Sequence, residues 1–306
     1  MNNKILEGKN IIIIGASTGI GKALSFGLAE LGAKVGLVSR SKDKLEQNVN
    51  KIKEMGCFAT FYVADTSKYD QIKASIDFFA SELNEIHVLI NNAAIASLET
   101  NIPSVELIDK VIDINLKGTL YSTLAILPYF KKIKMGSIIN TSSVAGLFNW
   151  DGASPLYDIT KAGINRFTTT RNSDFEMNKI RINSILPGWV MTPMIEHIPN
   201  NVLKSMVEGT GVPIMKPEEL IPYYVFFASD FSKRETKKLV NVVSFMRAFK
   251  FIEQLPKDIP RKFENLKELL QKNVSYGTFS NVSENKKLFD FILNYNEIIG
   301  EKDNKT

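Results

Sequence analysis

The stretch that decides the fold is residues 11–21, which have the sequence IIIIGASTGIG. Four consecutive isoleucines are apolar on both faces, as expected of a strand that helices cover on either side. The glycine-rich turn that follows, ahead of a helical pattern, is typical of a loop that binds a pyrophosphate. Gly15 permits the tight turn, Gly19 leaves room where the phosphates approach, and Gly21 lets the helix pack closely on the strand. A plain glycine-rich turn is the alternative, and the flanking strand and helix disfavour it.

The same alternation of apolar runs and amphipathic stretches continues through most of the chain. It predicts right-handed βαβ units and therefore an α/β class protein with a doubly wound parallel sheet, a Rossmann fold with helices on both faces. We expect strands at 10–14, 34–39, 58–63, 87–90, 137–141 and 181–186, and helices at about 20–32, 43–55, 68–84, 104–132 and 156–178.

The alternation changes after Pro187. Residues 191–210 combine prolines, asparagines and glycines with a short apolar stretch, which suits a mobile loop or lid. A helix is expected near 218–229, and a last strand at 239–245.

The remaining residues predict a helical C-terminal extension. We divide the chain into a cofactor-binding catalytic domain, residues 1–245, and an extension, residues 246–306, that packs on this domain or on a partner subunit. One amphipathic helix is expected after Pro260 and another after Ser283, which can cap it.

Composition disfavours several classes of function. The 306 residues carry a net charge of +5 with no long basic block, so nucleic-acid binding is not expected. The single cysteine, Cys57, excludes an internal disulfide, and two histidines argue against a histidine-rich metal site, so no metal is expected. No apolar run approaches the roughly 18 residues that span a bilayer, and no signal-peptide core is present at the start. We expect a cytoplasmic protein; association of the extension with a membrane surface is the weaker alternative.

Tyr157 and Lys161 form a candidate catalytic pair. A tyrosine with its ordinary pKa of about 10 is a poor proton relay at neutral pH. A lysine one helical turn later lies on the same face, and its charge favours the phenolate. Tyr157 could then protonate a carbonyl oxygen as a hydride arrives, or take the proton from an alcohol. The pair alone is weak support, but Ser143 follows one strand and the glycine loop another, and strand ends of such a sheet converge on one crevice.

The second strand should end beside the adenosine ribose of a bound dinucleotide. An acidic residue there would accept hydrogen bonds from the ribose hydroxyls, whereas this chain has Arg40. A guanidinium suits a 2′-phosphate, so NADP(H) is predicted over NAD(H). Two alternatives stay open. Arg40 could be a solvated strand-end charge, and Asp65 could either accept from the adenine amino group or cap the helix that begins near Ser67.

Six sequence elements, in this order and near this spacing, resemble the short-chain dehydrogenase/reductase superfamily over residues 8 to about 194. They are the glycine loop 15–21, Asn91-Asn92-Ala93-Ala94, Asn115 with Gly118, residues 143–146, Tyr157 with Lys161, and Asn183 with Pro187-Gly188 and Thr192. The resemblance implies an oxidoreductase that transfers a hydride between a nicotinamide and a ketone or alcohol. A cofactor-binding regulatory or scaffold protein of the same fold, without turnover, is the alternative.

The resemblance also implies a role for each matched residue. Tyr157 would be the acid/base, Lys161 would tune it and hold the nicotinamide ribose, and Ser143 would bond the substrate oxygen. Asn115 would support a water that links Lys161 to solvent. Taken singly, Asn115 could be a helix-kink residue, Ser143 a turn former and Thr192 a cap. The expected cofactor contacts are Gly15, Ser17, Thr18, Gly19, Ile20, Gly21, Arg40, Asp65, Asn91, Ala93, Tyr157, Lys161, Pro187, Gly188, Val190 and Thr192.

Three departures from the superfamily pattern are visible. An isoleucine precedes Gly15 where a threonine is usual, Ser143 and Tyr157 are one residue further apart than usual, and the helical extension replaces a closing Asp-Gly-Gly. The last departure puts the superfamily's common tetramer in doubt. The helices near 104–132 and 156–178 could still pair in a homodimer.

The residues expected to face the nicotinamide are apolar and aromatic, which predicts a hydrophobic ketone or alcohol as the substrate. No arginine or lysine occurs in these stretches before Lys204, so a small acid is not expected. The predicted lining consists of Ile95, Leu147, Phe148, Trp150, Trp189, Met191 and Met194.

Overall fold

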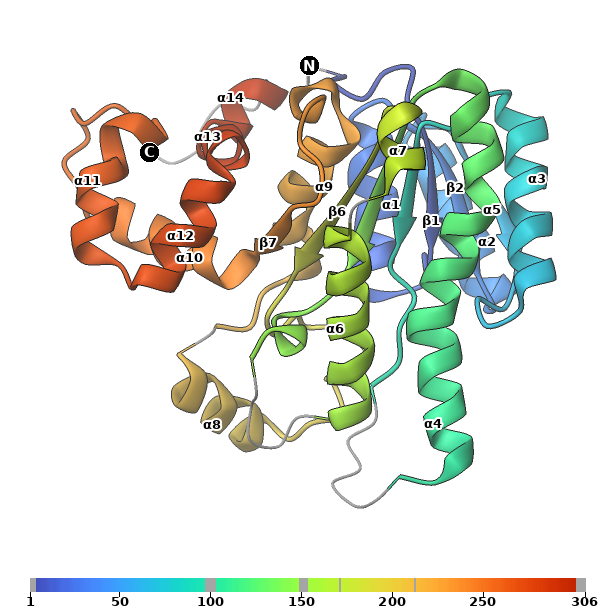
Figure 1. Ribbon diagram of the computed structural model, residues 1–306, viewed down its shortest axis with the longest axis horizontal. Helices are drawn as coiled ribbons and strands as arrows, with labels where there is room; N and C mark the ends of the chain where they lie inside the picture. Colours follow the sequence, from blue (N-terminus) through green and yellow to red (C-terminus); the bar gives the residue numbers. More distant parts are fainter. Residues whose placement is uncertain (1–3, 97–102, 149–153, 171, 212, 301–306) are drawn as a thin grey trace.

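The structure, a computed structural model, describes residues 4–96, 103–148, 154–170, 172–211 and 213–300. In these residues a seven-stranded parallel sheet has the order β3-β2-β1-β4-β5-β6-β7 (Figure 1). The strand order reverses between β1 and β4, which opens a crevice at the carboxyl ends of the strands. The predicted doubly wound α/β fold is confirmed. The strands are β1 Asn10–Ile14, β2 Lys34–Ser39, β3 Ala59–Val63, β4 Val88–Asn91, β5 Gly136–Thr141, β6 Ile180–Leu186 and β7 Leu239–Asn241.

Alternate residues of β1 face opposite layers of helices. Ile11 and Ile13 pack in the core beneath α1, α2 and α9, whereas Ile12 and Ile14 pack against α3 and α5. The isoleucine run is therefore buried on both faces, which explains its unbroken apolar sequence. These helices are α1 Gly19–Glu30, α2 Lys42–Glu54, α3 Tyr69–Leu83, α5 Gly118–Ile133 and α9 Ile221–Ala228.

The two long helices of the sequence prediction are interrupted. Instead of one helix over 104–132, α4 (Val105–Val111) leads into a π-helical turn, η1 (Ile112–Lys117), and then into α5. Single π turns widen a helix and are frequent at functional sites. The helix predicted over 156–178 is α6 (Pro155–Thr169) followed by α7 (Ser173–Met177).

The segment predicted as a lid is only partly a loop. Its second half forms α8 (Asn200–Thr210), which lies beyond the carboxyl ends of the strands (Figure 1). A bridge between Val190 and Met215 closes the segment at its base. The short helix η3 (Pro217–Leu220) then leads into α9, in place of the helix predicted at 218–229.

The last strand is shorter than predicted. β7 ends at Asn241, whose side chain accepts a hydrogen bond from the Ser244 amide and caps α10 (Val242–Ile252). The predicted strand over 239–245 is therefore wrong from Val242 onward, because the asparagine cap outweighs the β propensity of Val242-Val243. The predicted domain boundary at residue 245 falls inside α10.

The extension is helical, as predicted, but its helices begin elsewhere. Ser283 lies inside α12 and does not cap a helix, so that prediction is wrong. Ser275 caps α12 instead by accepting from the Thr278 amide at 3.3 Å. The helices are α11 Phe263–Asn273, α12 Tyr276–Glu284, α13 Lys286–Leu293 and α14 Tyr295–Ile299.

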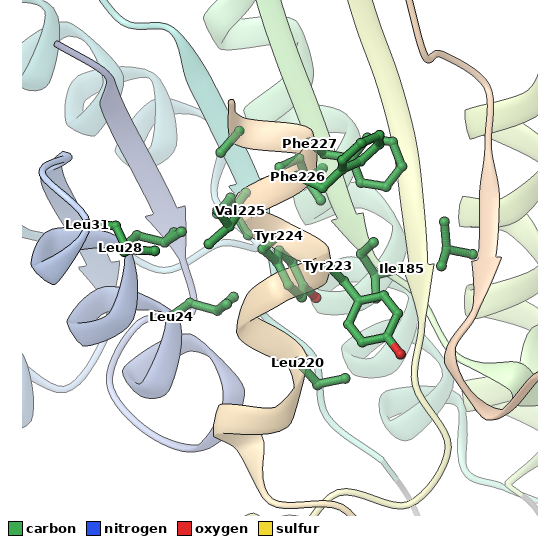
Figure 2. Close-up of a cluster of buried hydrophobic side chains, with 14 of the residues drawn as sticks. Leu24, Leu28, Leu31, Ile185, Leu220, Tyr223, Tyr224, Val225, Phe226 and Phe227 are labelled. Carbon is green, nitrogen blue, oxygen red and sulfur yellow. The ribbon is translucent and has the colours of Figure 1, made fainter. Parts of the chain in front are cut away.

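Helix α9 lies between α1 and the extension. One side of α9 packs against Leu24 and Leu28 of α1 (Figure 2). The extension covers the other side, where the ring centroids of Phe226 and Phe291 are 5.3 Å apart. The extension thus packs on α9 of its own chain.

Asn281 of α12 closes the free edge of the sheet. Its side chain accepts from the Asn241 amide at 3.2 Å and donates to the Leu239 carbonyl at 3.0 Å. Both backbone groups belong to β7, and a further strand would need them. The extension therefore blocks pairing of another strand at this edge.

None of the helices in the described parts of the chain has the length and apolarity that crossing a bilayer requires.

Candidate active site

A cavity of about 1300 Å³ opens at the crevice predicted by the strand order. Its walls come from the glycine loop, the ends of β2 and β4, the segment after β5, the start of α6, and residues 187–205. Most of the predicted site residues line it: Gly15, Ser17, Thr18, Gly19, Ile20, Arg40, Ala93, Ser143, Tyr157, Lys161, Pro187, Gly188, Val190 and Thr192.

The three glycines of the first loop each sit where a side chain would collide. Gly15 has φ +85°, and a Cβ there would lie 2.6 Å from the Ala93 amide nitrogen. A Cβ on Gly21 would lie 2.0 Å from the Gly15 carbonyl oxygen, so α1 packs directly on the turn. A Cβ on Gly19 would lie 2.9 Å from Thr192 Cγ2. The glycine loop therefore contacts the segment after β6, and Gly21 supports the cavity without lining it.

The N-terminus of α1 is available to an anion. Thr18 is the N-cap residue, and its side chain makes no capping hydrogen bond. The first amides of α1 and the partial positive charge of the helix end therefore face the cavity. Two asparagines hold this loop in place: Asn48, which the sequence analysis missed, donates to the Ser17 carbonyl at 3.2 Å, and Asn92 of the element 91–94 donates to the Gly15 carbonyl at 3.0 Å.

Arg40 lines the cavity directly after β2 and is largely exposed. Its Nη1 lies 4.0 Å from Asp65 Oδ2. Asp65 is not among the lining residues, and its Oδ1 accepts from the amide and hydroxyl of Ser67 at 2.9 and 2.8 Å. Burial raises the pKa of the Asp65 carboxyl, but the Ser67 hydrogen bonds and the Arg40 charge outweigh it and hold the pKa below its ordinary value. Asp65 thus closes a turn, while Lys68 is the N-cap of α3.

Asn91 lies beneath the cavity floor. Its Nδ2 donates to Asn140 Oδ1 at 2.9 Å, and its Oδ1 accepts from the Ser122 hydroxyl at 2.6 Å. These bonds join β4, β5 and α5. Asn91 is one of the expected cofactor contacts, but this network occupies its side chain, and its neighbours Asn92 and Ala93 line the cavity.

Asn115 holds a wall of the cavity from inside the π turn. Its side chain accepts from the Ile95 amide and donates to the Ile95 carbonyl, both at 2.8 Å. It also donates to the Thr160 hydroxyl at 3.2 Å. Asn115 is fully buried and does not line the cavity. Its hydrogen bonds make it a positioning residue, and its part in a proton relay stays a prediction.

Ser143, Tyr157 and Lys161 meet on one wall. Ser143 is the N-cap of the short helix η2 (Val144–Gly146) and forms a hydrogen bond with the Tyr157 hydroxyl. Ser154 and Pro155 begin α6, which places Tyr157 and Lys161 one turn apart. Lys161 Nζ lies 5.3 Å from the centroid of the Tyr157 ring.

Burial dominates the ionisation of this pair. It raises the pKa of Tyr157 to about 12, although the Ser143 hydrogen bond acts in the opposite direction. It also lowers the pKa of Lys161 to about 7. The predicted lowering of the tyrosine pKa by Lys161 is therefore wrong for the protein alone, because removal from water disfavours phenolate and ammonium alike. A tyrosine that keeps its proton at neutral pH can serve as a general acid.

Tyr224 of α9 reaches the catalytic wall from a distant part of the sequence. The Thr141 carbonyl accepts from Lys161 Nζ at 2.8 Å, and the Thr141 hydroxyl lies 2.7 Å from the Tyr224 hydroxyl. All three residues are buried. No motif marks Tyr224, and the sequence analysis missed it. This chain of contacts makes Tyr224 a positioning residue for the Lys161 ammonium.

Tyr224→Phe should lower the free energy of unfolding by about 1–2 kcal/mol, because the buried Thr141 hydroxyl loses its partner. It should also shift the pH profile of kcat/KM, since Thr141 holds Lys161. Denaturant unfolding and pH-rate profiles measure the two effects. Tyr223→Phe is the matched control, because it removes the same atom from the neighbouring buried position of α9. Identical pH profiles for the two variants would contradict the positioning role.

The substrate end of the cavity is more polar than predicted. Ile95, Trp189 and Met194 line it as expected, but Leu147, Phe148 and Met191 do not and are instead exposed. Trp150 lies outside the described residues. The prediction of an apolar and aromatic lining is therefore wrong in part, because proximity in sequence does not fix which way a loop side chain points. Four polar residues contribute to the wall: Asp158, His197, Asn201 and Ser205.

Comparison with known proteins identifies the family. Residues 9–202 match the family model described as short chain dehydrogenase. The chain belongs to the short-chain dehydrogenase/reductase family. The match covers the six elements that suggested this superfamily, and it ends before the extension.

Within the described residues no group of three or more histidine, cysteine or acidic side chains could hold a metal ion.

Relatives of this dehydrogenase/reductase are similar over nearly their whole length. The chain is 34% identical over 242 residues to the 3-oxoacyl-[acyl-carrier-protein] reductase FabG of Thermotoga maritima, covering 78% of this chain and 97% of FabG. It is 33% identical to the oxidoreductase UcpA of Salmonella typhimurium, covering 74% and 89%. A 3-oxoacyl-[acyl-carrier protein] reductase from Brucella melitensis, solved with bound NAD, is 26% identical with a TM-score of 0.71, covering 78% and 91%.

Proposed function

We propose that this dehydrogenase/reductase uses NADP(H) to interconvert a largely hydrophobic ketone and the corresponding alcohol. The observation that carries the proposal is that Ser143, Tyr157 and Lys161 share one cavity with the glycine loop and the open N-terminus of α1. A carbonyl group beside Tyr157 would therefore lie in the same space as a dinucleotide on the loop. NADPH oxidation in the presence of aromatic and long-chain ketones tests the proposal.

The chain's own residues would handle the proton. In the direction of reduction, the Tyr157 phenol donates its proton to the carbonyl oxygen, and the Ser143 hydroxyl binds the same oxygen. The bound nicotinamide supplies the hydride. Lys161, 5.3 Å from the tyrosine ring, offsets the negative charge that remains on the phenolate. Oxidation of an alcohol uses the same groups in reverse.

The glycine loop and its neighbours would hold the cofactor. The amides at the start of α1 suit the pyrophosphate, with Ser17, Thr18 and Ile20 around them. Pro187, Gly188, Val190 and Thr192 would hold the carboxamide end. These assignments fit the close approach of the two segments in the cavity wall. A Cβ on Gly19 of the glycine loop would fill the space beside Thr192.

Arg40 supports the choice of NADP(H). It lines the cavity directly after β2, where a guanidinium would meet a 2′-phosphate. A similar solved structure holds NAD, so the choice rests on this chain's own residues.

Arg40→Asp should therefore reverse the nucleotide preference. We expect the wild type to bind NADPH about ten- to a hundredfold more tightly than NADH, because the 2′-phosphate gains a charge-assisted bond worth about 1.5–3 kcal/mol. The variant should prefer NADH, since a carboxylate repels the phosphate. Fluorescence titration of each nucleotide measures the preference. Arg234→Asp, an equal charge change at an exposed position outside this cavity, should keep the wild-type preference. An unchanged preference in Arg40→Asp would sink the cofactor assignment.

The homodimer and the cytoplasmic location stay predictions. Two observations support a dimer that uses α5 and α6: Leu124 of α5 is 56% exposed, and Ile159 of α6 is 60% exposed. Large apolar side chains on neighbouring helices favour association with a second copy. Light scattering of the full chain tests it, and a monomeric mass would contradict it.

A further inference from the structure

Asp158 is an acidic group on the cavity wall beside the catalytic tyrosine. It follows Tyr157 in α6 and lines the same cavity. Its Oδ1 is buried and accepts no hydrogen bond from the residues that the structure describes. Burial raises the pKa of this carboxyl. Buried oxygens nearly always have a donor, and one that lacks it calls for an explanation.

The position of Asp158 is unfavourable for the tyrosine. Its negative charge raises the pKa of Tyr157 and so opposes formation of the phenolate. An acidic group that hinders the acid/base residue and packs without a donor is costly to both stability and catalysis. Such local conflicts are expected where a residue serves a ligand.

No ion pair joins Asp158 to a cationic side chain on the part of the cavity wall that the structure describes. Among the described residues that line the cavity, the cationic side chains are Arg40 and Lys161. Arg40 lies after β2 near Asp65, at the end assigned to the adenosine. Lys161 donates to the Thr141 carbonyl. Because the described residues give this oxygen no hydrogen bond, a molecule bound in the cavity can supply the donor.

We propose that Asp158 binds a hydroxyl group of the substrate, which makes the substrate a hydroxy ketone or the corresponding diol. The inference rests on the proposed carbonyl chemistry of Tyr157. Asp158 and Tyr157 line the cavity from the same turn of α6, so we expect the hydroxyl on a carbon close to the carbonyl. The χ2 torsion of an aspartate is soft, so either carboxyl oxygen can turn toward it. Three further polar residues of the cavity wall, His197, Asn201 and Ser205, suit the same amphipathic substrate.

Matched pairs of ketones test the proposal on the full-length protein with NADPH. 2-Hydroxyacetophenone is compared with propiophenone, and 4-hydroxy-2-butanone with 2-pentanone, because each pair exchanges a hydroxyl for a methyl of similar size. In at least one pair, wild-type kcat/KM should favour the hydroxy ketone by about tenfold or more, because a site built for a hydroxyl rejects the analogue that lacks it. Asp158→Leu should bring the ratio near one, and Asp158→Asn, which keeps an acceptor, should give an intermediate ratio.

Asp70→Asn is the control for charge, because Asp70 is exposed on α3 and does not line the cavity. It should keep the wild-type ratio. A ratio near one in the wild type for both pairs, or a preference that survives in Asp158→Leu, would overturn the proposal while leaving ketone reduction intact. If Asp158→Leu does not fold, Asp158→Asn provides the test. A ratio of kcat/KM between hydroxy ketone and methyl analogue equal to that of the wild type would then overturn the proposal.

A binding measurement distinguishes failure of this inference from failure of the proposed function. If none of the four ketones is reduced, carbonyl reduction fails for these compounds, and titration calorimetry of the same pairs then tests Asp158 alone. Tighter binding of a hydroxy ketone to wild type, lost in Asp158→Leu, would support the inference. Equal binding within both pairs would overturn it.

Discussion

Replacing Tyr157 with phenylalanine should reduce kcat/KM for ketone reduction by about 10²–10⁴-fold, while NADPH still binds. The phenol carries the only proton that the proposed mechanism transfers to the carbonyl oxygen. Its pKa of about 12 keeps that proton in place at neutral pH. The variant removes one oxygen atom from a wall that Ser143 and Lys161 otherwise preserve. Initial rates of NADPH oxidation and nucleotide titration measure the two quantities separately.

Tyr276→Phe is the matched control for this substitution. Tyr276 is 85% exposed at the start of α12 and far from the cavity in sequence. Its loss should leave the rate unchanged. Equal rates for wild type and Tyr157→Phe would refute the catalytic assignment and favour the alternative, a cofactor-binding protein without turnover.

Replacing Gly21 with alanine should be the most destabilising change in the glycine loop. The new Cβ would lie 2.0 Å from the Gly15 carbonyl oxygen and 2.8 Å from Asn92 Nδ2. Backbone atoms cannot yield as a flexible side chain does, so α1 must move away from β1. We expect a loss of about 3 kcal/mol in the free energy of unfolding and loss of measurable NADPH binding. Urea unfolding and nucleotide titration measure both.

Gly277→Ala is the control, and we expect its effect on the free energy of unfolding to have the opposite sign. Nothing lies within 4 Å of a Cβ placed on Gly277, which is in α12 and has no positive φ. Alanine is favoured over glycine in helices, so this substitution should be neutral or stabilising, by up to about 1 kcal/mol. Similar destabilisation by the two alanines would show that the close approach at Gly21 does not restrict the loop.

Local sequence signals predicted the elements of the sheet well where one residue type dominated. The isoleucine run gave β1 with the observed bounds, because a strand covered on both faces must be apolar throughout. The same kind of signal failed at Val242-Val243, where the cap formed by Asn241 begins a helix instead. The π turn was also missed; within it Asn115 binds the distant Ile95 backbone, a contact that the local sequence pattern does not reveal.

The candidate site was predicted as a set of residues, and the structure shows which of them line the cavity and which lie behind its wall. The glycine loop, Ser143, Tyr157 and Lys161 share the cavity, as the strand order required. Asn91 and Asn115 support the cavity wall from behind. The pKa of Tyr157 was predicted in the wrong direction, because the sequence shows the neighbouring charge but not the degree of burial.

The sequence by itself determined the layered fold, and it predicted the glycine loop as the dinucleotide site and Tyr157 with Lys161 as the acid/base pair. Each of these depends on spacing within one or two turns or strands, which side-chain periodicity and glycine placement express directly. Only the tertiary structure decided that Tyr224 reaches Thr141, that Asn281 closes the sheet edge and that Asp158 borders the cavity without a donor. These features are contacts, or missing contacts, between side chains that the packing of whole helices brings together, and no local pattern encodes them.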